Sequence, residues 1–375
     1  MPPATWQMLR TGRASETASS DSGRLPLLLP RTAGVRLPTA LRTMRVAKVA
    51  VATLLALAAT SSSLTPQAIA GFSNPYAQPG RLVRLPDGRA INLVCVGRGS
   101  PTVVFESGFG AGASAWGQVQ PLVAGETRAC SYDRAGYGFS TAGPMPRTGE
   151  AIARDLDMAL RRADERGPFV LVGHSAGGLY ARLFAARRPA DIAGLVLVDT
   201  SVPFQDRRLA QIFGPGSGSL DGVRQRPAAC AKAAQTGSKA ELEAFSCLSG
   251  IADTDGARAG MLASWKTQVS ELDTLFTTTS AQVNRTGDLL KSVPTIVLTA
   301  SPTGLAAGRE DPAAMVWQAF HREIAAKFFR GEQRIVKSSH LMMTEQPEAV
   351  AKAVLDLVHK GRRANPSKLP VGPRG

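Results

Sequence analysis

A serine framed by glycines is the strongest chemical signal in the sequence. Residues 169–178 read Phe-Val-Leu-Val-Gly-His-Ser-Ala-Gly-Gly, an apolar run followed by a Gly-x-Ser-x-Gly turn around Ser175 and a segment of helical character. A side chain at Gly173 or Gly177 would collide with its neighbours across so tight a turn, which favours glycine at both positions. Such a strand-to-helix turn lifts the serine hydroxyl clear of a sheet, where a base can reach it. The pattern therefore predicts that Ser175 is a nucleophile.

The base that such a serine needs is best supplied by His340. The chain has four histidines. His174 adjoins the serine and is expected to point away from it, His321 lies inside a predicted helix, and His359 lies at the end of the last helix. His340 instead follows the last predicted strand and precedes the last helix, on a loop. We therefore expect His340 to accept the serine's proton.

The elements that must position these residues alternate between strands and helices. Apolar runs predict strands at 81–85, 89–96, 101–105, 128–132, 169–172, 194–198, 294–299 and 333–337. Helices are predicted at 113–122, 148–162, 179–187, 313–329 and 348–359. Continuous apolar strands that alternate with helices are typical of an α/β protein with a mostly parallel sheet covered on both faces. Residues 202–288 break the alternation with mostly helical, amphipathic composition, which predicts a cap above the strand ends.

With these elements in place, the chain resembles the α/β-hydrolase superfamily, and within it the bacterial esterase/lipase-type enzymes. Four segments carry the resemblance: Val104-Phe-Glu-Ser-Gly-Phe-Gly110, Tyr132-Asp-Arg-Ala-Gly-Tyr-Gly-Phe-Ser140, Gly173-His-Ser-Ala-Gly-Gly178, and Ser339-His340 before Gln346-Pro347-Glu348. It implies an α/β-hydrolase fold with an eight-stranded, mostly parallel sheet, helices on both faces and a helical cap inserted after the sixth strand. It also implies a serine hydrolase that cleaves carboxylic esters through an acyl-enzyme.

The resemblance leaves two positions for the acid of a Ser-His-Asp triad. Some lipases of this superfamily take the acid from the end of the strand that follows the nucleophile helix, where this chain has Asp199. More members take it from a loop after the next strand, where the carboxylates here are Glu310 and Asp311, and Asp311 also resembles a helix N-cap. We favour Asp199 and keep Asp311 as the alternative. For the oxyanion hole, the resemblance implies the backbone N–H groups of Ala176 and Phe109.

The cysteines and the apolar side chains of the cap give further expectations. Cys95 and Cys130 lie on strands that are neighbours in the usual order of this fold, so a disulfide between them is geometrically possible, but we expect two buried free thiols there. Cys230 and Cys247 lie within the cap, where a disulfide would be typical of an exported protein. The apolar side chains of the cap either hold it together or line an acyl pocket: Phe204, Phe213, Phe245, Met261, Leu262, Trp265 and Leu275.

The positive charge of the chain is concentrated at its two ends. The formal net charge is +15, but residues 1–70 carry eight Lys/Arg against two Asp/Glu, and residues 360–375 carry five Lys/Arg and no acid. The modest excess on the body indicates an ordinary soluble surface, so we expect no nucleic-acid partner. The basic tail, residues 360–375, is expected to be disordered.

The N-terminal region predicts export. Residues 1–43 lack any period and are expected to be a disordered extension, or a stretch upstream of a true start at Met44. Residues 44–70 combine a charged n-region, the apolar run 49–59 and an Ala68-Ile-Ala70 cleavage site, which is typical of a signal peptide. The apolar run is too short for a stable membrane span. We therefore expect a secreted or periplasmic protein, and the alternatives for this segment are a membrane anchor or an organelle transit peptide.

The predicted mature chain then divides into a core and a cap. The core comprises residues 71–201 and 289–359, and the cap comprises residues 202–288. No Cys/His spacing suggests zinc and no phosphate-binding loop is present, so we expect no cofactor and no metal. The expected partner is a small-molecule ester. The alternatives are a perhydrolase, acyltransferase or amidase with the same triad, or a non-catalytic binding protein on a hydrolase fold.

Overall fold

An eight-stranded sheet is the frame of the protein in a computed structural model that describes residues 74–248, 255–301 and 311–364. The predicted N-terminal extension and signal peptide lie outside the described residues, as does Glu310. The strands are β1 (Arg81–Arg84), β2 (Ala90–Val96), β3 (Thr102–Glu106), β4 (Ala129–Tyr132), β5 (Phe169–His174), β6 (Ile192–Val198), β7 (Thr295–Ser301) and β8 (Gly331–Lys337). Their order is β1-β2-β4-β3-β5-β6-β7-β8, and only β1–β2 and β2–β4 pair antiparallel. The expected fold class is thereby confirmed.

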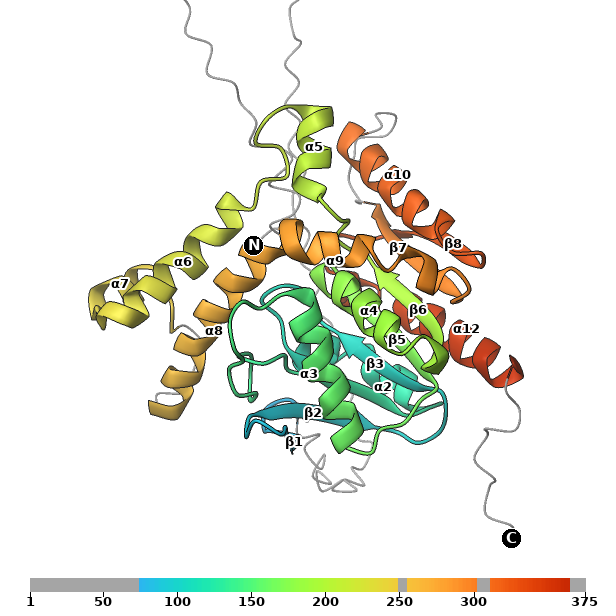
Figure 1. Ribbon diagram of the computed structural model, residues 1–375, viewed down its shortest axis with the longest axis horizontal. Helices are drawn as coiled ribbons and strands as arrows, with labels where there is room; N and C mark the ends of the chain where they lie inside the picture. The colour runs from blue at the N-terminus through green and yellow to red at the C-terminus, as the bar shows by residue number, and fades with distance from the viewer. Residues whose placement is uncertain (1–73, 249–254, 302–310, 365–375) are drawn as a thin grey trace, which may run out of the picture. The chain divides into compact units, whose positions relative to one another are not determined.

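Helices cover both faces of this sheet, and α3 and α4 cross in front of it in Figure 1. One apolar cluster joins a sheet face to α3 (Gly149–Arg162), α4 (Ala176–Arg187) and α10 (Pro312–Ala326). The other face packs against the remaining core helices, η1 (Ala113–Trp116), α2 (Gln120–Ala124), α11 (Met342–Glu345) and α12 (Pro347–Ala364). A short turn of 3-10 helix, η2 (Pro189–Asp191), precedes β6.

Helix α3 shows how local sequence sets these elements. Thr148 caps its N-terminus, because the threonine hydroxyl accepts a hydrogen bond of 3.3 Å from the Ala151 N–H. Ile152, Leu156 and Leu160 recur every four residues and are buried together against the sheet. The predicted helix at 113–122 is instead two short pieces, η1 and α2, separated by residues 117–119.

The cap is a set of helices inserted between β6 and β7. Its elements are α5 (Gln205–Phe213), α6 (Asp221–Thr236), α7 (Lys239–Ala244), α8 (Asp255–Thr274), the π-helical turn η3 (Leu275–Thr279), α9 (Ser280–Asn284) and η4 (Gly287–Leu290). Figure 1 shows α6, α7 and α8 together to one side of the sheet. The end of α8 is tied to the core, since Ser270 accepts a hydrogen bond from the Arg147 N–H and Thr274 donates one to the Arg147 carbonyl.

All four cysteines form disulfides, which corrects one expectation. Cys230 and Cys247 are joined within the cap. Cys95 and Cys130 are also joined, so the expectation of two buried free thiols was wrong. The antiparallel register of β2 and β4 places these two residues directly opposite each other, with their Cα atoms 4.0 Å apart. Side chains at directly opposed positions leave the sheet on the same face, which brings the two sulfurs together.

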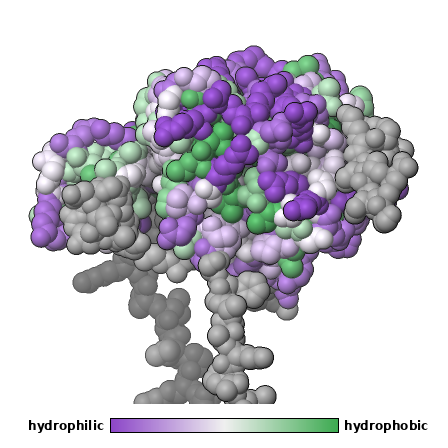
Figure 2. Space-filling view, turned by 90° about the horizontal axis from the view of Figure 1, so that it is seen from below, coloured by the Kyte–Doolittle hydropathy of each residue, from purple (hydrophilic) through white to green (hydrophobic). Residues whose placement is uncertain are grey.

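The last helix extends beyond the expected end of the core. α12 continues to Ala364, so residues 360–364, which were expected to be disordered, are helical. Among the described residues, no helix has both the length and the apolar character that a bilayer crossing requires. Figure 2 shows hydrophobic residues in a band across the centre of one face, between hydrophilic areas.

The sheet register brings the predicted functional loops to one edge. Glu106 at the end of β3 pairs with Gly173 of β5, and His174 pairs with Val198 at the end of β6. Parallel strands end on the same side, and ligands of open α/β sheets bind beyond their carboxyl ends. The loops that carry Phe109, Ser175 and Asp199 therefore start at the same edge.

Candidate active site

Ser175 occupies a strained turn between β5 and α4. Its backbone has φ 53° and ψ −125°, a sparsely populated conformation that costs about 1–3 kcal/mol. Three backbone hydrogen bonds hold it: the Ser175 N–H donates to the Val198 carbonyl at 3.1 Å, and the Ser175 carbonyl accepts from Gly178 and Ser201, each at 3.0 Å. The turn thus leaves Ser175 half-buried on the wall of a cavity.

The two glycines of the turn are required by close backbone contact. A Cβ at Gly173 would lie 2.6 Å from the Gly177 carbonyl oxygen. A Cβ at Gly177 would lie 2.5 Å from the carbonyl oxygens of both Glu106 and Ser107. Any larger residue would push the start of α4 away from β5 or from the end of β3.

His340 and Asp199 form a buried hydrogen-bonded pair. His340 Nδ1 lies 2.6 Å from Asp199 Oδ2. The other carboxylate oxygen, Oδ1, accepts hydrogen bonds from the Ala300 N–H at 3.0 Å and from Trp317 Nε1 at 2.8 Å. Burial opposes ionisation of this carboxyl, but the His340 hydrogen bond and charge outweigh it and lower the pKa of Asp199 to about 2. The carboxylate is therefore ionised, which fixes Nδ1 of His340 as the donor and leaves Nε2 as an acceptor.

Of the two candidate acids, the structure places Asp199 at His340. Asp311 caps α10 instead, where its carboxylate accepts a hydrogen bond of 2.9 Å from the Ala313 N–H. That contact is the N-cap role that the sequence suggested for it.

The other histidines are held by structural contacts. His174 does not point away as expected: it lines the same cavity as Ser175, and its Nε2 donates to the His340 carbonyl at 2.9 Å. Burial lowers the pKa of His174 to about 3, and nearby His340 adds to the effect, so its ring is neutral. His321 is buried between Thr299 and the Thr200 carbonyl, and His359 pairs with Glu126.

The cavity beside Ser175 has a volume of about 320 Å³ and a largely apolar wall. His340 lines it together with both predicted oxyanion residues, Phe109 and Ala176. Ala176 is the first residue of α4, and the first N–H groups of a helix have no partner within it. The apolar lining comes mainly from the cap and from the loop after His340: Leu220, Val223, Leu272, Leu275, Phe276, Leu341 and Met343.

A buried ion cluster supports the loop that carries Phe109. Arg134 donates to the carbonyls of Ser107 and Gly108, at 2.7 and 3.0 Å, and pairs with Glu106 at 3.0 Å. Its other side pairs with Glu271 of cap helix α8, at 3.0 and 3.1 Å. Arg134 therefore connects the cap to the candidate oxyanion loop.

The cluster holds two carboxyls and one guanidinium away from water. It is neutral only when one acid keeps its proton, because ionising both would leave an uncompensated buried charge. Consistent with this, burial raises the pKa of Glu106 to about 7 although Arg134 and Tyr132 oppose the shift. The sequence offered one signal for this cluster: Ser264, Gln268 and Glu271 recur at helical spacing. In the structure all three are buried and form a polar stripe on α8.

Comparisons with known proteins agree with this fold. The model of the alpha/beta hydrolase family matches residues 103–353. The chain belongs to the alpha/beta hydrolase family.

Curated relatives of this chain match part of its length, and solved structures match its fold. An uncharacterized protein of Bacillus subtilis, YqjL, is 33% identical over 106 residues, which are 28% of this chain and 42% of the relative. This chain thus spans less than half of the length of the curated relatives it matches. A thermophilic esterase from Thermogutta terrifontis aligns over 76% of this chain and 99% of its own, with 22% identity and a TM-score of 0.51. The enol-lactonase of Burkholderia xenovorans aligns over 73% and 98%, with 19% identity and a TM-score of 0.51.

Proposed function

We propose that this chain is an exported serine hydrolase that cleaves carboxylic esters through Ser175, His340 and Asp199. The observation that carries the proposal is the hydrogen bond between the ionised Asp199 and His340 Nδ1, because His340 lines the cavity that also holds Ser175. This arrangement leaves the Nε2 lone pair of His340 for the serine proton, as the triad mechanism requires.

Each group then has one task in the reaction. His340 Nε2 takes the proton as Ser175 Oγ bonds to the ester carbonyl carbon, and Asp199 stabilises the imidazolium. The N–H groups of Ala176 and Phe109 stabilise the charge that develops on the carbonyl oxygen. The C–O bond to the alcohol then breaks, the alcohol leaves with the proton from His340, and the acyl group stays on Ser175. A water molecule deprotonated by His340 releases the acid and restores the serine.

Export is the second part of the proposal. Two observations support it: the predicted signal peptide at 44–70, and the presence of every cysteine in a disulfide. Disulfides persist in secreted and periplasmic proteins and are rare in a reducing cytosol.

One experiment tests both parts. Protein recovered from the medium or periplasm is weighed by intact-mass spectrometry before and after exposure to a fluorophosphonate. We expect a single adduct on the wild type, none on Ser175→Ala, and a retained adduct on Ser201→Ala, whose hydroxyl lines the same cavity. The unlabelled mass should correspond to a chain that starts near Gly71.

Other results of this experiment would refute one part of the proposal or change the reaction assigned to the triad. A folded wild type that takes no adduct refutes the serine hydrolase and favours a binding protein on this fold. A mass that includes Met1 refutes the signal peptide at 44–70, and protein that is found only in the cytoplasm refutes export. An adduct without turnover of p-nitrophenyl butyrate in water, but with turnover when peroxide, an alcohol or an amide is offered, assigns the same triad to a perhydrolase, an acyltransferase or an amidase.

A further inference from the structure

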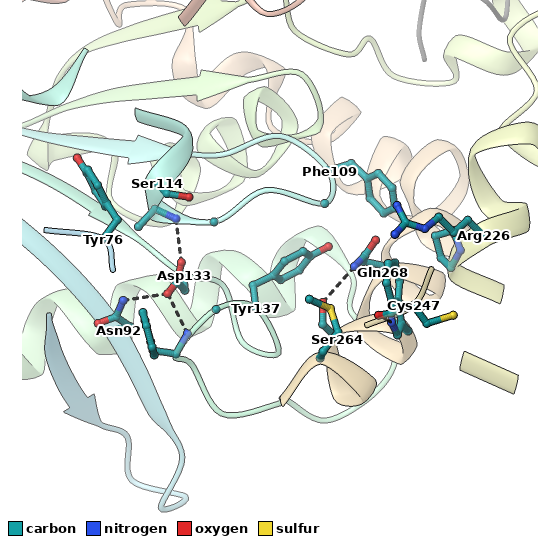
Figure 3. Close-up of a pocket in the computed structure, with 18 of the residues that line it drawn as sticks. Tyr76, Asn92, Phe109, Ser114, Asp133, Tyr137, Arg226, Cys247, Ser264 and Gln268 are labelled. Atoms are coloured by element: carbon teal, nitrogen blue, oxygen red, sulfur yellow. Dashed lines mark hydrogen bonds between the residues drawn. The ribbon is translucent and has the colours of Figure 1, made fainter. Parts of the chain in front are cut away.

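A second cavity adjoins the apolar one at Ser175. It has a volume of about 600 Å³ and lies between the candidate oxyanion loop, the turn at 133–139 and cap helices α6 and α8 (Figure 3). Phe109 and Val223 line both cavities, so the two spaces meet at the loop that carries a predicted oxyanion donor. We call this second space the polar chamber, because Asn92, Asp133, Ser264 and Gln268 are among its walls.

Gln268 gives the polar chamber a buried acceptor. Its side chain is only 7% exposed, and Nε2 donates to Ser264 Oγ at 3.0 Å. In Figure 3, Oε1 points away from Ser264 and toward Phe109. A Cβ built on the neighbouring loop residue Gly110 would lie 3.8 Å from Oε1, so the amide oxygen faces the edge of that loop. No described residue donates a hydrogen bond to Oε1, so this oxygen on the wall of the polar chamber can accept one from a ligand.

Most other polar groups of the polar chamber are already occupied. The Asp133 carboxylate accepts from the Ala113 N–H, the Phe139 N–H and Asn92 Nδ2, at 2.8 to 3.0 Å. The Tyr137 hydroxyl donates to Glu271 at 2.9 Å. The Arg226 guanidinium, which also lines the polar chamber, donates to the carbonyls of Phe245 and Ser246. On the side of helix α8, the groups that face the space are the Gln268 carbonyl oxygen and the Ser264 hydroxyl, which still has its proton to donate. This pair matches an uncharged group that carries hydroxyls, because a hydroxyl both donates and accepts.

An ester bound at Ser175 must place two groups, one on each side of its carbonyl carbon, and the two cavities can each hold one of them. An ester carbonyl carries two substituents, the acyl chain and the alcohol, which diverge from the reacting carbon. The cavity at Ser175 has an apolar wall and room for roughly ten non-hydrogen atoms at about 30 Å³ each. A polar substituent would lose its hydrogen bonds there, at a cost of about 1–3 kcal/mol for each group. The polar chamber, which begins at Phe109, offers those hydrogen bonds instead.

We infer that the preferred substrate is a two-part ester, with an aliphatic half in the apolar cavity and an uncharged hydroxylated half in the polar chamber. Gln268 is the residue that selects the hydroxylated half. This inference rests on the proposed ester hydrolysis and names the substrate class of that site.

The test compares esters that differ only in the hydroxyls. Glycerol monobutyrate and butyl butyrate share the acyl half, and butyl glycerate carries its hydroxyls on the acid half instead. The kcat/KM of each is measured for the wild type, for Gln268→Leu and for Gln211→Leu, a matched change at an exposed glutamine of cap helix α5. We expect Gln268→Leu to lose about tenfold on one hydroxylated ester and to keep butyl butyrate turnover within about twofold. The affected hydroxylated ester shows which half of the substrate enters the polar chamber.

The other outcomes overturn either the role of Gln268 or the proposed ester hydrolysis. If Gln268→Leu loses all three esters equally, or none, Gln268 does not select a hydroxylated group and the inference fails while ester hydrolysis stands. Turnover of butyl butyrate by this variant also shows that it has folded. Ser264→Ala provides a second probe, with a smaller loss on the same hydroxylated ester. If the wild type cleaves none of the esters, the proposed function itself fails.

Discussion

Replacing Asp199 by asparagine tests the candidate triad most sharply, because either orientation of the asparagine amide loses hydrogen bonds that Asp199 makes. If the amide nitrogen takes the place of Oδ2, it donates toward His340 Nδ1. The imidazole must then carry its proton on Nε2, where it cannot accept the Ser175 proton. If the amide is turned over, its nitrogen faces the Ala300 N–H and Trp317 Nε1, two donors that then lose their acceptor.

The expected size of the effect follows from these two arrangements. The turned-over amide leaves two buried N–H donors unpaired, at about 1–3 kcal/mol each, so the arrangement with the wrong histidine tautomer is favoured. In serine-protease triads the same exchange lowers kcat about 10⁴-fold, which corresponds to about 5.5 kcal/mol of transition-state stabilisation. We expect a loss of this order here, with little change in KM.

The assay is the initial rate of p-nitrophenyl butyrate hydrolysis, with Asp311→Asn as the matched control. Asp311 caps α10, and asparagine caps a helix about as well as aspartate does. The control should therefore keep its activity and its stability. Asp199→Asn with nearly wild-type kcat would refute the reasoning, and a large loss in Asp311→Asn would move the acid to the later loop.

Two further predictions concern the ion cluster around Arg134. Glu271→Gln should lower the free energy of unfolding in urea by roughly 3 kcal/mol, because it removes one partner of a buried ion pair. Glu323→Gln, which breaks an exposed pair with Arg208, should cost less than about 1 kcal/mol, and equal losses would contradict the argument. Glu106 keeps its proton in the folded state up to about pH 7, whereas the unfolded chain releases it near its ordinary pKa of 4.5. Its contribution to stability should therefore fall by about 3 kcal/mol as the pH rises between these values. Glu106→Gln should remove this dependence, and identical pH profiles of the two proteins would count against it.

The parts of the fold that local sequence determines were predicted well. The Gly173–Gly177 turn could be identified because the glycines, the apolar strand and the helix that follows are adjacent in the chain. His340 could be selected because its place between the last strand and the last helix depends on element order alone. Both inferences use short-range rules that hold wherever the fold is formed.

The parts that depend on register and on distant contacts could not be predicted. The sequence favoured Asp199 but left Asp311 open, because the choice depends on which strand end lies beside His340. The expectation of free thiols at Cys95 and Cys130 failed for a related reason: only the register of β2 against β4 places them opposite each other. Arg134 and Glu271 are 137 residues apart, and only the folded cap brings them together.

The disulfide between Cys95 and Cys130 makes the stability of the expressed protein depend on the redox state of the compartment in which it folds. The two cysteines are 35 residues apart, and the ring they close contains β3 and Phe109. Closing such a ring restricts the unfolded chain and contributes about 4 kcal/mol, and the ring within the cap contributes about 3 kcal/mol. A domain is typically stable by only about 5–15 kcal/mol. Expression in a reducing cytosol would therefore remove a large share of the stability, whereas an oxidising compartment would retain the cross-link that tethers the loop carrying Phe109.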